Sequence, residues 1–347
     1  MQKRFILIIL AELIFVFAIA QNPPQDKNWA VVFEDDFTNG FIYGWGNNRW
    51  YKHSGAKNAG TSDESKEFYI YNNANIENGK LVLRVQNENS PPCGPNCIYG
   101  GTHRYTSGGI ASNAHYQYGY FEVYAQLPVG DGFFPAFWLW NDEVSPNYWY
   151  NEIDIMEADG GYPTWTSTNH DVFINPDPNQ PHNVAIKHPC YYADGSYHWY
   201  GVEWNKDKIT FYIDKKIVRQ VANNEKGEGI QHPMGIIIEF QLFSDFWCHY
   251  CSCVSASTVF PNYMRVDQCN VYKLKYDCSK NETINTFNDF SNYNYKVKKS
   301  ITLSGTTILP TGSNISLRAT DYIELQNGFT VANGAELYLD NNPCDSQ

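Results

Sequence analysis

The six residues from Glu152 to Glu157, which read Glu-Ile-Asp-Ile-Met-Glu, alternate acidic and apolar side chains near the middle of the chain. In an extended strand successive side chains point to opposite faces, so Glu152 and Asp154 share one face and the two isoleucines the other. Strict alternation would place Met156 beside the acids and Glu157 in the apolar layer. A β-bulge at about Ile155 to Met156 would return Glu157 to the acidic face, and bulges are over-represented beside active sites. The segment therefore predicts a strand with three acids on its solvent-facing side.

Such a row of like charges is costly unless it is used, because the acids raise one another's pKa and destabilise the sheet. Retaining glycoside hydrolysis requires two carboxyl groups about 5 Å apart, one ionised and one protonated. On this chemistry we predict Glu152 as nucleophile and Glu157 as general acid/base. Asp154 then hydrogen-bonds the nucleophile and helps to separate the two pKa values. The alternatives for the bare spacing are an acidic strand edge or part of a Ca²⁺ site.

Motifs on both sides of the acids follow one another in a fixed order. They are Val31–Phe37, Tyr105–Gly109, Tyr118–Val123, Leu127–Gly132 and Phe134–Trp138 before the acids, and Tyr197–Trp204, Ile209–Asp214 and Met264–Asp267 after them. Together they resemble glycoside hydrolase family 16, of the laminarinase and β-glucanase type with a bulged acid strand, over roughly residues 29 to 277. The resemblance implies a jelly-roll β-sandwich of the concanavalin-like class, a carbohydrate cleft on its concave sheet, and the same acid and base roles.

Length and composition agree with an all-β chain. The 347 residues include 26 Tyr, 20 Phe and 10 Trp, enough for one large β domain and a small appendage. Alternating segments predict strands at Leu81–Val85, Phe121–Leu127 and Ile209–Ile213, and Asn78-Gly79 predicts a tight hairpin turn. We expect the catalytic domain to occupy residues 21–278.

The amino terminus has the three regions of a signal peptide. Lys3-Arg4 precede an apolar run from Phe5 to Ile19, and Ala18-Ile19-Ala20 is a small-residue cleavage site. We therefore expect residues 1–20 to be removed after Ala20 and the mature protein to be secreted. No later stretch approaches the ~20 apolar residues of a transmembrane helix, so no membrane span is expected.

Nine cysteines in an exported chain suggest disulfides, and the odd count leaves at least one without a partner in the chain. Cys93 and Cys97 are close enough to staple a local loop. Cys248 and Cys251 have the spacing of a zinc site, with His249 between them, but export favours disulfides over zinc. We therefore predict no catalytic metal and no required cofactor, and leave a structural Ca²⁺ on the sandwich open.

The composition changes after Cys278. Residues 279–300 are rich in Asn, Thr, Ser and Lys and predict a linker. From Ile301 to the end at residue 347 short apolar triplets recur between glycine-containing turns, which predicts a small repetitive β stack. This stretch resembles a tail module attached to exported proteins of Bacteroidetes-type bacteria. A spacer, a sorting element and a glycan-binding module are the alternatives, with the spacer preferred.

Several aromatic residues are candidates for contact with sugar. In a strand Phe134, Trp138 and Trp140 share one face, which forms either a stacking platform leading to the acids or part of the core. The resemblance assigns Trp138 and Phe134 to the cleft and places His170 where relatives often carry a cleft histidine. Within Phe243–Cys253, which stands in place of a Gly-Gly-Trp loop, Trp247 is the residue that could stack on sugar.

The net charge of the chain bears on whether its polysaccharide substrate is neutral or anionic. With 25 basic and 37 acidic residues the net charge is −12, a field that repels polyanions and favours a neutral glycan, first a β-1,3-glucan of the laminarin type. Two departures from the family pattern keep a galactan open, such as agarose, porphyran or carrageenan. Phe134 stands where laminarin-cleaving relatives often have Trp, and Gly109 where many have Arg. Transglycosylation is the alternative to hydrolysis.

A non-catalytic lectin on the same sandwich is the competing class of function, and the acid row argues against it. The sequence has no phosphate-cradling glycine loop and no basic face, which excludes nucleotide and nucleic-acid chemistry. The sequence therefore predicts a secreted, monomeric, retaining endo-acting hydrolase whose partner is a β-linked polysaccharide.

Overall fold

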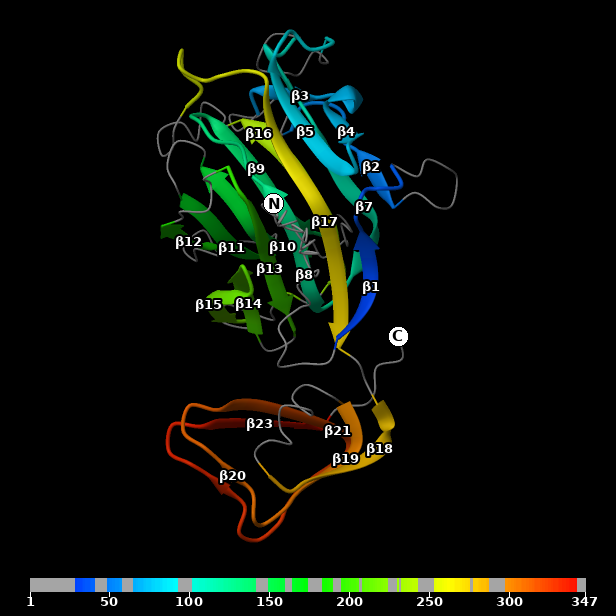
Figure 1. Ribbon diagram of the computed structural model, residues 1–347, viewed down its shortest axis with the longest axis vertical. Helices are drawn as coiled ribbons and strands as arrows, with labels where there is room; N and C mark the ends of the chain where they lie inside the picture. The colour runs from blue at the N-terminus through cyan, green and yellow to red at the C-terminus, as the bar shows by residue number, and fades with distance from the viewer. Residues whose placement is uncertain are drawn as a thin grey trace, which may run out of the picture.

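The computed structural model describes residues 29–40, 49–57, 65–92, 102–141, 149–159, 164–173, 183–189, 195–205, 208–223, 230, 232–242, 253–274, 277–286 and 297–341. These residues are almost entirely in strands, and a short 3₁₀ helix spans Tyr71–Asn73. Figure 1 shows two facing sheets and a separate stack of strands at one end of the molecule. None of the helices in the described part is long and apolar enough to cross a membrane. The predicted all-β fold is confirmed.

The first sheet of the sandwich contains ten strands within the described residues. Their order is β15 (Lys216–Ala222), β14 (Lys208–Ile213), β13 (Tyr197–Trp204), β8 (Gly119–Gln126), β17 (Asn262–Leu274), β5 (Lys80–Asn87), β6 (Tyr105–Ser107) and β3 (Glu67–Tyr69), while β1 (Trp29–Asp35) pairs with β17 and β4 (Ala74–Glu77) with β5. The predicted hairpin at Asn78-Gly79 joins β4 to β5, and both residues have positive φ, 53° and 72°. That geometry is the one a two-residue hairpin turn of type I′ requires.

The second sheet carries the acid row. Its seven described strands are ordered β12 (Asn183–Pro189), β11 (Thr164–Phe173), β10 (Trp149–Asp159), β9 (Phe133–Trp140), β16 (Met234–Leu242), β7 (Gly109–Tyr116) and β2 (Trp50–Lys52). All these neighbours pair antiparallel. Strands β10, β9 and β16 are therefore interior strands, which hold the side chains of the row in fixed register.

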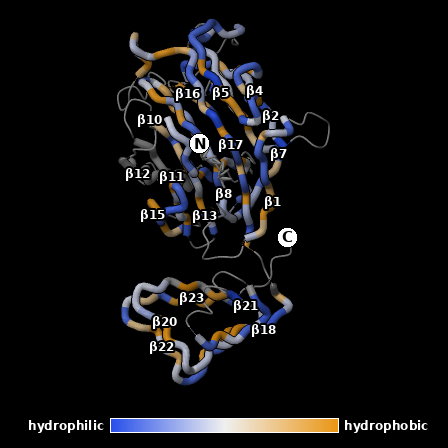
Figure 2. Tube along the Cα trace, in the orientation of Figure 1, coloured by the Kyte–Doolittle hydropathy of each residue, from blue (hydrophilic) through white to orange (hydrophobic). Residues whose placement is uncertain are grey.

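The core lies between the two sheets. Phe121 and Val123 of β8, from the first sheet, belong to one buried cluster with Phe137 and Leu139 of β9. Polar and apolar residues alternate along β8, so one of its faces packs inward and the other is more polar (Figure 2). Because the inward face of the second sheet packs against the first, its opposite face, here called the open face, is left for binding.

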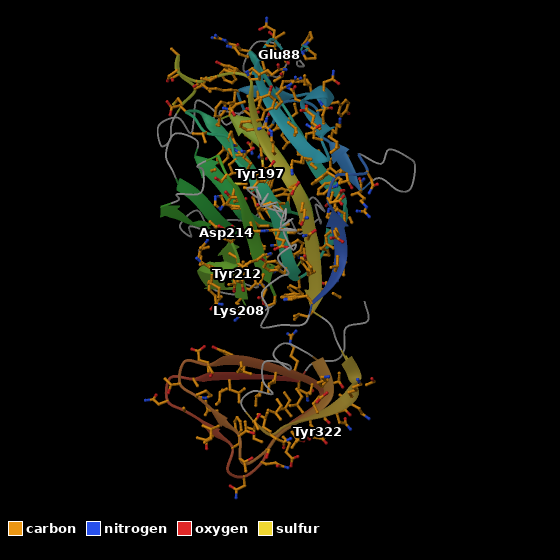
Figure 3. All side chains as sticks on the ribbon, viewed as in Figure 1. Glu88, Tyr197, Lys208, Tyr212, Asp214 and Tyr322 are labelled. Atoms are coloured by element: carbon orange, nitrogen blue, oxygen red, sulfur yellow. The ribbon has the colours of Figure 1, made fainter. Side chains whose placement is uncertain are left out.

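The outer face of the first sheet also contains a buried charge. Glu122 on β8 is fully buried and forms an ion pair with Lys215. Asn270 and Tyr272 of β17 also donate hydrogen bonds to Glu122, at 3.3 and 3.2 Å. Lys215 lies in the turn between β14 and β15, directly after Asp214, which Figure 3 labels. The ion pair therefore ties this turn to the centre of the sheet.

The carboxy-terminal strands pair only with one another among the described residues. They are β18 (Asp277–Ile284), β19 (Val297–Leu303), β21 (Asn314–Leu325) and β23 (Glu336–Asn341) in one parallel sheet, and β20 (Ile308–Leu309) with β22 (Thr330–Val331) in another. Ile301 lies opposite Ile323, and Ile315 opposite Leu337, so partners are 22 residues apart along the chain. This is the repetitive β stack that the triplets predict.

The stretch 279–300, which the sequence predicts to be a linker, differs in the structure. Strand β18 covers its beginning and pairs with β19, which starts at Val297, so the stack begins at Asp277. Ile284 is the buried apolar residue of β18 and packs in the stack's own core. Its other residues are mainly polar, which is why no apolar period marks the strand in the sequence.

Three of the nine cysteines lie in the described part of the chain. Cys253 and Cys278 are in disulfide bonds. Cys269, on β17, is a free thiol that is completely buried in the sandwich core. Cys93, Cys97, Cys248 and Cys251 lie outside the described residues, so neither the predicted local staple nor the zinc alternative falls within them.

Candidate active site

A β-bulge in β10 sets the phase of the acid row. Asp154 lies opposite Trp138 of β9 and Thr168 of β11, and the register then shifts before Glu157, which lies opposite Ala136 and Thr166. Ile155 and Met156 are consecutive, yet both are buried in the core between the sheets. Glu157 consequently returns to the open face with Glu152 and Asp154. The predicted bulge is confirmed.

The three acids differ in exposure. Glu152 and Glu157 are half-buried, whereas Asp154 is only 2% exposed. A half-buried carboxyl can reach a bound substrate and exchange protons with water. A carboxyl buried between two such groups can influence their charge while making little contact with solvent. The row thus has two accessible ends and a shielded middle.

Aromatic residues of β9 continue this face. Trp138 and Trp140 lie edge to face, with ring centroids 5.8 Å apart and an interplanar angle of 64°. Both line an open cavity of about 480 Å³, together with Ile237 and a group of three tyrosines, Tyr51, Tyr69 and Tyr71. Aromatic faces stack on sugar rings, and the cavity is in the size range of ligand pockets. Trp138 therefore lies in the cleft and not in the core between the sheets.

The other predicted sugar contacts fall in different places. Phe134 is half-buried on β9, opposite Gln241 and on the same face as Trp138. His170 lies on β11 directly opposite Glu152, so its backbone position is adjacent to the acid row. Its side chain lies outside the described residues. Trp247 also lies outside them.

One carboxylate of this face is absent from the sequence-based prediction. Glu239 of β16 lies opposite Ala136, which in turn lies opposite Glu157, so the two glutamates stand in one row across three strands. Glu239 is 1% exposed. Its oxygens accept hydrogen bonds from Trp138 Nε1 at 3.1 Å, Tyr69 OH at 2.9 Å and Gln241 Nε2 at 2.5 Å. The only sequence signal is a glutamate at an open-face position of an apolar strand.

A lysine completes this network. Lys57 Nζ lies 3.1 Å from Glu239 Oε1 and 4.6 Å from the centroid of the Trp138 ring. Burial alone would raise the pKa of Glu239, but the positive charge of Lys57 and the nearby His53, whose Nδ1 lies 3.6 Å from Glu239 Oε2, outweigh it and hold the pKa at about 2. Burial opposes the charge of Lys57, yet Glu239, Glu152 and Glu157 together raise its pKa. The pair is therefore fully ionised at neutral pH.

The absence of a side chain at Gly109 leaves the space that Glu239 and its neighbours occupy. A Cβ at this position would meet His53 Nδ1 at 2.8 Å, Glu239 Cβ at 3.0 Å and Tyr69 Cε1 at 3.1 Å. No side chain fits there unless these groups move. The departure from the Arg of many relatives at this position therefore makes space for Glu239 and its donors.

Glu67 lies near Glu239 but, unlike Glu239, is mostly uncharged at neutral pH. It is completely buried on β3, and one carboxylate oxygen accepts a hydrogen bond from the Leu242 backbone N–H at 3.1 Å. Burial raises the pKa of Glu67 to about 8, and the nearby charge of Glu239 adds to the effect. Glu67 is therefore mostly protonated at neutral pH.

Comparison with known proteins shows the family of the chain. The model of glycosyl hydrolases family 16 matches residues 56–247, more than half of the chain. The chain belongs to glycosyl hydrolases family 16. The matched range includes Lys57, the acid row and Glu239, whereas Tyr51 of the cavity wall precedes it. The resemblance drawn from the motifs is confirmed.

Individual members of family 16 resemble the chain at a moderate distance. Glucan endo-1,3-beta-glucosidase A1 of Niallia circulans is 29% identical over 220 residues, which are 58% of this chain and 31% of that protein. A beta-glucanase of Acetivibrio thermocellus is 26% identical over 226 residues, 64% of this chain and 60% of that protein. The chain therefore spans less than two thirds of the length of either relative.

The fold agrees with a solved structure of the family. The endo-beta-1,3-glucanase of Pyrococcus furiosus is 25% identical and superposes with a TM-score of 0.58 over 72% of this chain and 96% of that one. The predicted jelly-roll sandwich is confirmed by this likeness. A group of three or more His, Cys, Asp or Glu side chains able to hold a metal ion is not found among the described residues.

Proposed function

We propose that this family 16 protein is a secreted, retaining, endo-acting hydrolase of a β-1,3-glucan of the laminarin type. The observation that carries the proposal is the bulge in β10, which brings Glu157 to the face of Glu152 and Asp154 beside an aromatic cavity. A strand without a catalytic or binding role has no reason to keep three acids on one open face. The names of the relatives and of the solved structure also favour a β-1,3-glucan.

In the first step the Glu152 carboxylate attacks the anomeric carbon and the glycosidic C–O bond breaks. The Glu157 carboxylic acid gives its proton to the leaving oxygen, so the departing sugar leaves as an alcohol. The product of this step is a glycosyl ester on Glu152. Asp154, buried between the two, helps to hold the charge of Glu152 and to keep the two pKa values apart.

In the second step water resolves the ester. The Glu157 carboxylate, now the base, takes a proton from water. The water oxygen bonds to the anomeric carbon, and the bond between that carbon and Glu152 breaks. Two inversions at the same carbon give net retention. A sugar hydroxyl in place of water would give transglycosylation by the same chemistry.

Trp138 and Trp140 supply the stacking surface on which the glycan lies next to the acids. Phe134, His170 and Trp247 remain proposed contacts. The motif from Lys3 to Ala20 supports export with cleavage after Ala20, and we propose that the carboxy-terminal stack is a spacer.

The test is to incubate the purified mature protein with laminarin, mixed-linkage glucan, agarose, porphyran and carrageenan, and to size the products over time. Rapid appearance of mid-sized oligosaccharides from laminarin supports both the substrate and endo-action. Cleavage of a galactan and not of laminarin would replace the substrate and keep the mechanism. Binding without cleavage of any polymer would favour the lectin alternative.

A further inference from the structure

Lys57 lies at the wall of the open-face cavity, next to the acid row. About a third of its side chain is exposed (34%), and the residue lines the cavity in which a sugar would lie. We propose that Lys57 is a specificity-determining, substrate-binding residue, whose ammonium group donates hydrogen bonds to hydroxyls of a sugar bound in this cavity beside Trp138. This inference rests on the proposed function, because it assigns a role within the same cleft.

Glu239 itself has little capacity left for a substrate. A carboxylate has about four acceptor sites, and Glu239 already accepts from Trp138, Tyr69, Gln241 and Lys57. It is also buried, with 1% of its surface exposed. Its role is therefore to hold its donors in place, and the donor that faces the cavity with a flexible, charged end is Lys57.

Lys57 has donors to offer. An ammonium group has three N–H donors, and Glu239 takes one of them at 3.1 Å. The cation also lies over the face of the Trp138 ring, at 4.6 Å from its centroid, so Lys57 and Trp138 together form one part of the cavity wall. A sugar bound beside Trp138 in this cavity would have its hydroxyls within reach of Lys57.

At the point where β7 runs beside Glu239, its residue is Gly109, which carries no charged side chain. A side chain at Gly109 would collide with His53, Tyr69 and Glu239, so the strand beside Glu239 contributes only backbone there. The positive charge at this point instead comes from the segment after β2, through Lys57. The charge therefore lies on a segment of the chain separate from the acid strand.

The charge of Lys57 also acts on the catalytic row. The groups that face it are Glu239 on β16, Tyr69 and Glu67 on β3, His53 after β2, and Glu152 and Glu157 on β10. A positive charge near Glu152 and Glu157 favours their ionised forms. Removal of Lys57 should therefore change both KM and the acidic limb of the pH profile. Removal of a lysine with only a structural role would instead lower stability and leave KM and the pH profile of the folded enzyme unchanged.

The experiment compares Lys57→Met, Lys57→Arg and the charge-matched control Lys216→Met, which changes an exposed lysine on β15 of the other sheet. In the full chain, kcat and KM are measured on the glucan that the wild type cleaves fastest, from pH 4 to 8. Loss of hydrogen bonds from a charged donor should raise KM by about ten-fold or more for Lys57→Met. Its acidic limb should move to higher pH, Lys57→Arg should recover part of both effects, and Lys216→Met should match the wild type.

Lys57→Met leaves Glu239 as a buried charge without its cation and so can fail to fold. The double variant Lys57→Met/Glu239→Gln removes both charges and keeps the fold testable. It should also show a KM at least about ten-fold above that of the wild type. A wild-type KM and pH profile in either variant would overturn the inference. That result leaves the proposed function intact, whereas a wild type inactive on every polymer contradicts the proposed function instead.

Discussion

Asp154 lies directly opposite Trp138 in the β9–β10 ladder, so the middle acid of the row and the aromatic floor of the cleft are fixed to one another by the sheet. Both are nearly buried, at 2% and 8% exposure. Trp138 in turn donates its indole N–H to Glu239. A sugar bound beside Trp138 would therefore lie close to the acid row, at a distance set by backbone pairing.

This placement separates the effect of Asp154 from that of its neighbours. Asp154→Asn keeps the shape of the side chain and removes its charge, which tunes Glu152 but makes and breaks no bond with the substrate. We expect kcat to fall roughly 10- to 100-fold, clearly less than for Glu152→Gln, which removes the nucleophile. Steady-state kinetics of the two variants on the same glucan provide the check. Equal losses in both variants would contradict the supporting role of Asp154.

The pKa of Glu67 predicts a stability that depends on pH. Its pKa is raised from 4.5 to about 8 in the folded protein, chiefly by burial. A raised carboxyl pKa contributes stability that is fully present below pH 4.5 and is lost as the pH rises through about 8. Glu67→Gln removes this loss. Between pH 4.5 and about 8, the free energy of unfolding of the variant should therefore rise relative to that of the wild type, by up to about 1.4 kcal/mol per pH unit.

Urea unfolding at several pH values measures the difference. Glu77→Gln changes an exposed glutamate of β4 and serves as the control, with no pH-dependent gain expected. A constant gap between wild type and Glu67→Gln from pH 5 to 8 would contradict the assignment of a neutral Glu67.

Lys215 should be a strong determinant of stability although it lies outside the cleft. Lys215→Met leaves Glu122, which is 0% exposed, without its cation. Breaking a buried ion pair from one side costs roughly 3 to 5 kcal/mol. The neighbouring Lys216 is exposed, so Lys216→Met should change the free energy of unfolding by less than about 0.5 kcal/mol. Comparable denaturation midpoints for the two variants would show that the Glu122 pair carries little of the stability.

The carboxy-terminal stack should be dispensable for cleavage. Its strands β18 to β23 pair only with one another in the described part of the chain, so a protein ending at residue 276 keeps every strand of the sandwich. We expect the shortened protein to be soluble and to cleave short oligosaccharides at a near-normal rate. Aggregation, or loss of activity on every substrate, would indicate that the stack completes the sandwich or the cleft.

The acid strand could be predicted from sequence because its information is local. Glu152 and Asp154 fix the face, and Met156 is apolar where strict alternation demands an acid, so a bulge is the simplest way to use Glu157. The aromatic face of Trp138 followed from the same two-residue period. In both cases the chemistry lies within a few positions of the chain.

The Lys57–Glu239 pair could not be predicted, because its members are 182 residues apart and meet only when β16 pairs into the sheet. An isolated glutamate in Ile236–Leu242 gives no indication of its partner. The linker prediction for 279–300 was wrong over β18 for a related reason. A strand that pairs in a small parallel stack needs few apolar residues, and Ile284 alone reaches the core there.

The stereochemistry of the products tests the central claim, which is that the bulge in β10 makes Glu152 and Glu157 a close pair. If the two carboxyls lean together over one sugar ring, about 5 Å apart, they leave no room for the water of inverting hydrolysis, which requires a separation of roughly 6.5 to 9.5 Å. Proton NMR of the earliest products, recorded before mutarotation, is the measurement. The account predicts the β-anomer first. Appearance of the α-anomer first would contradict both the roles assigned to the two glutamates and the importance of the bulge that pairs them.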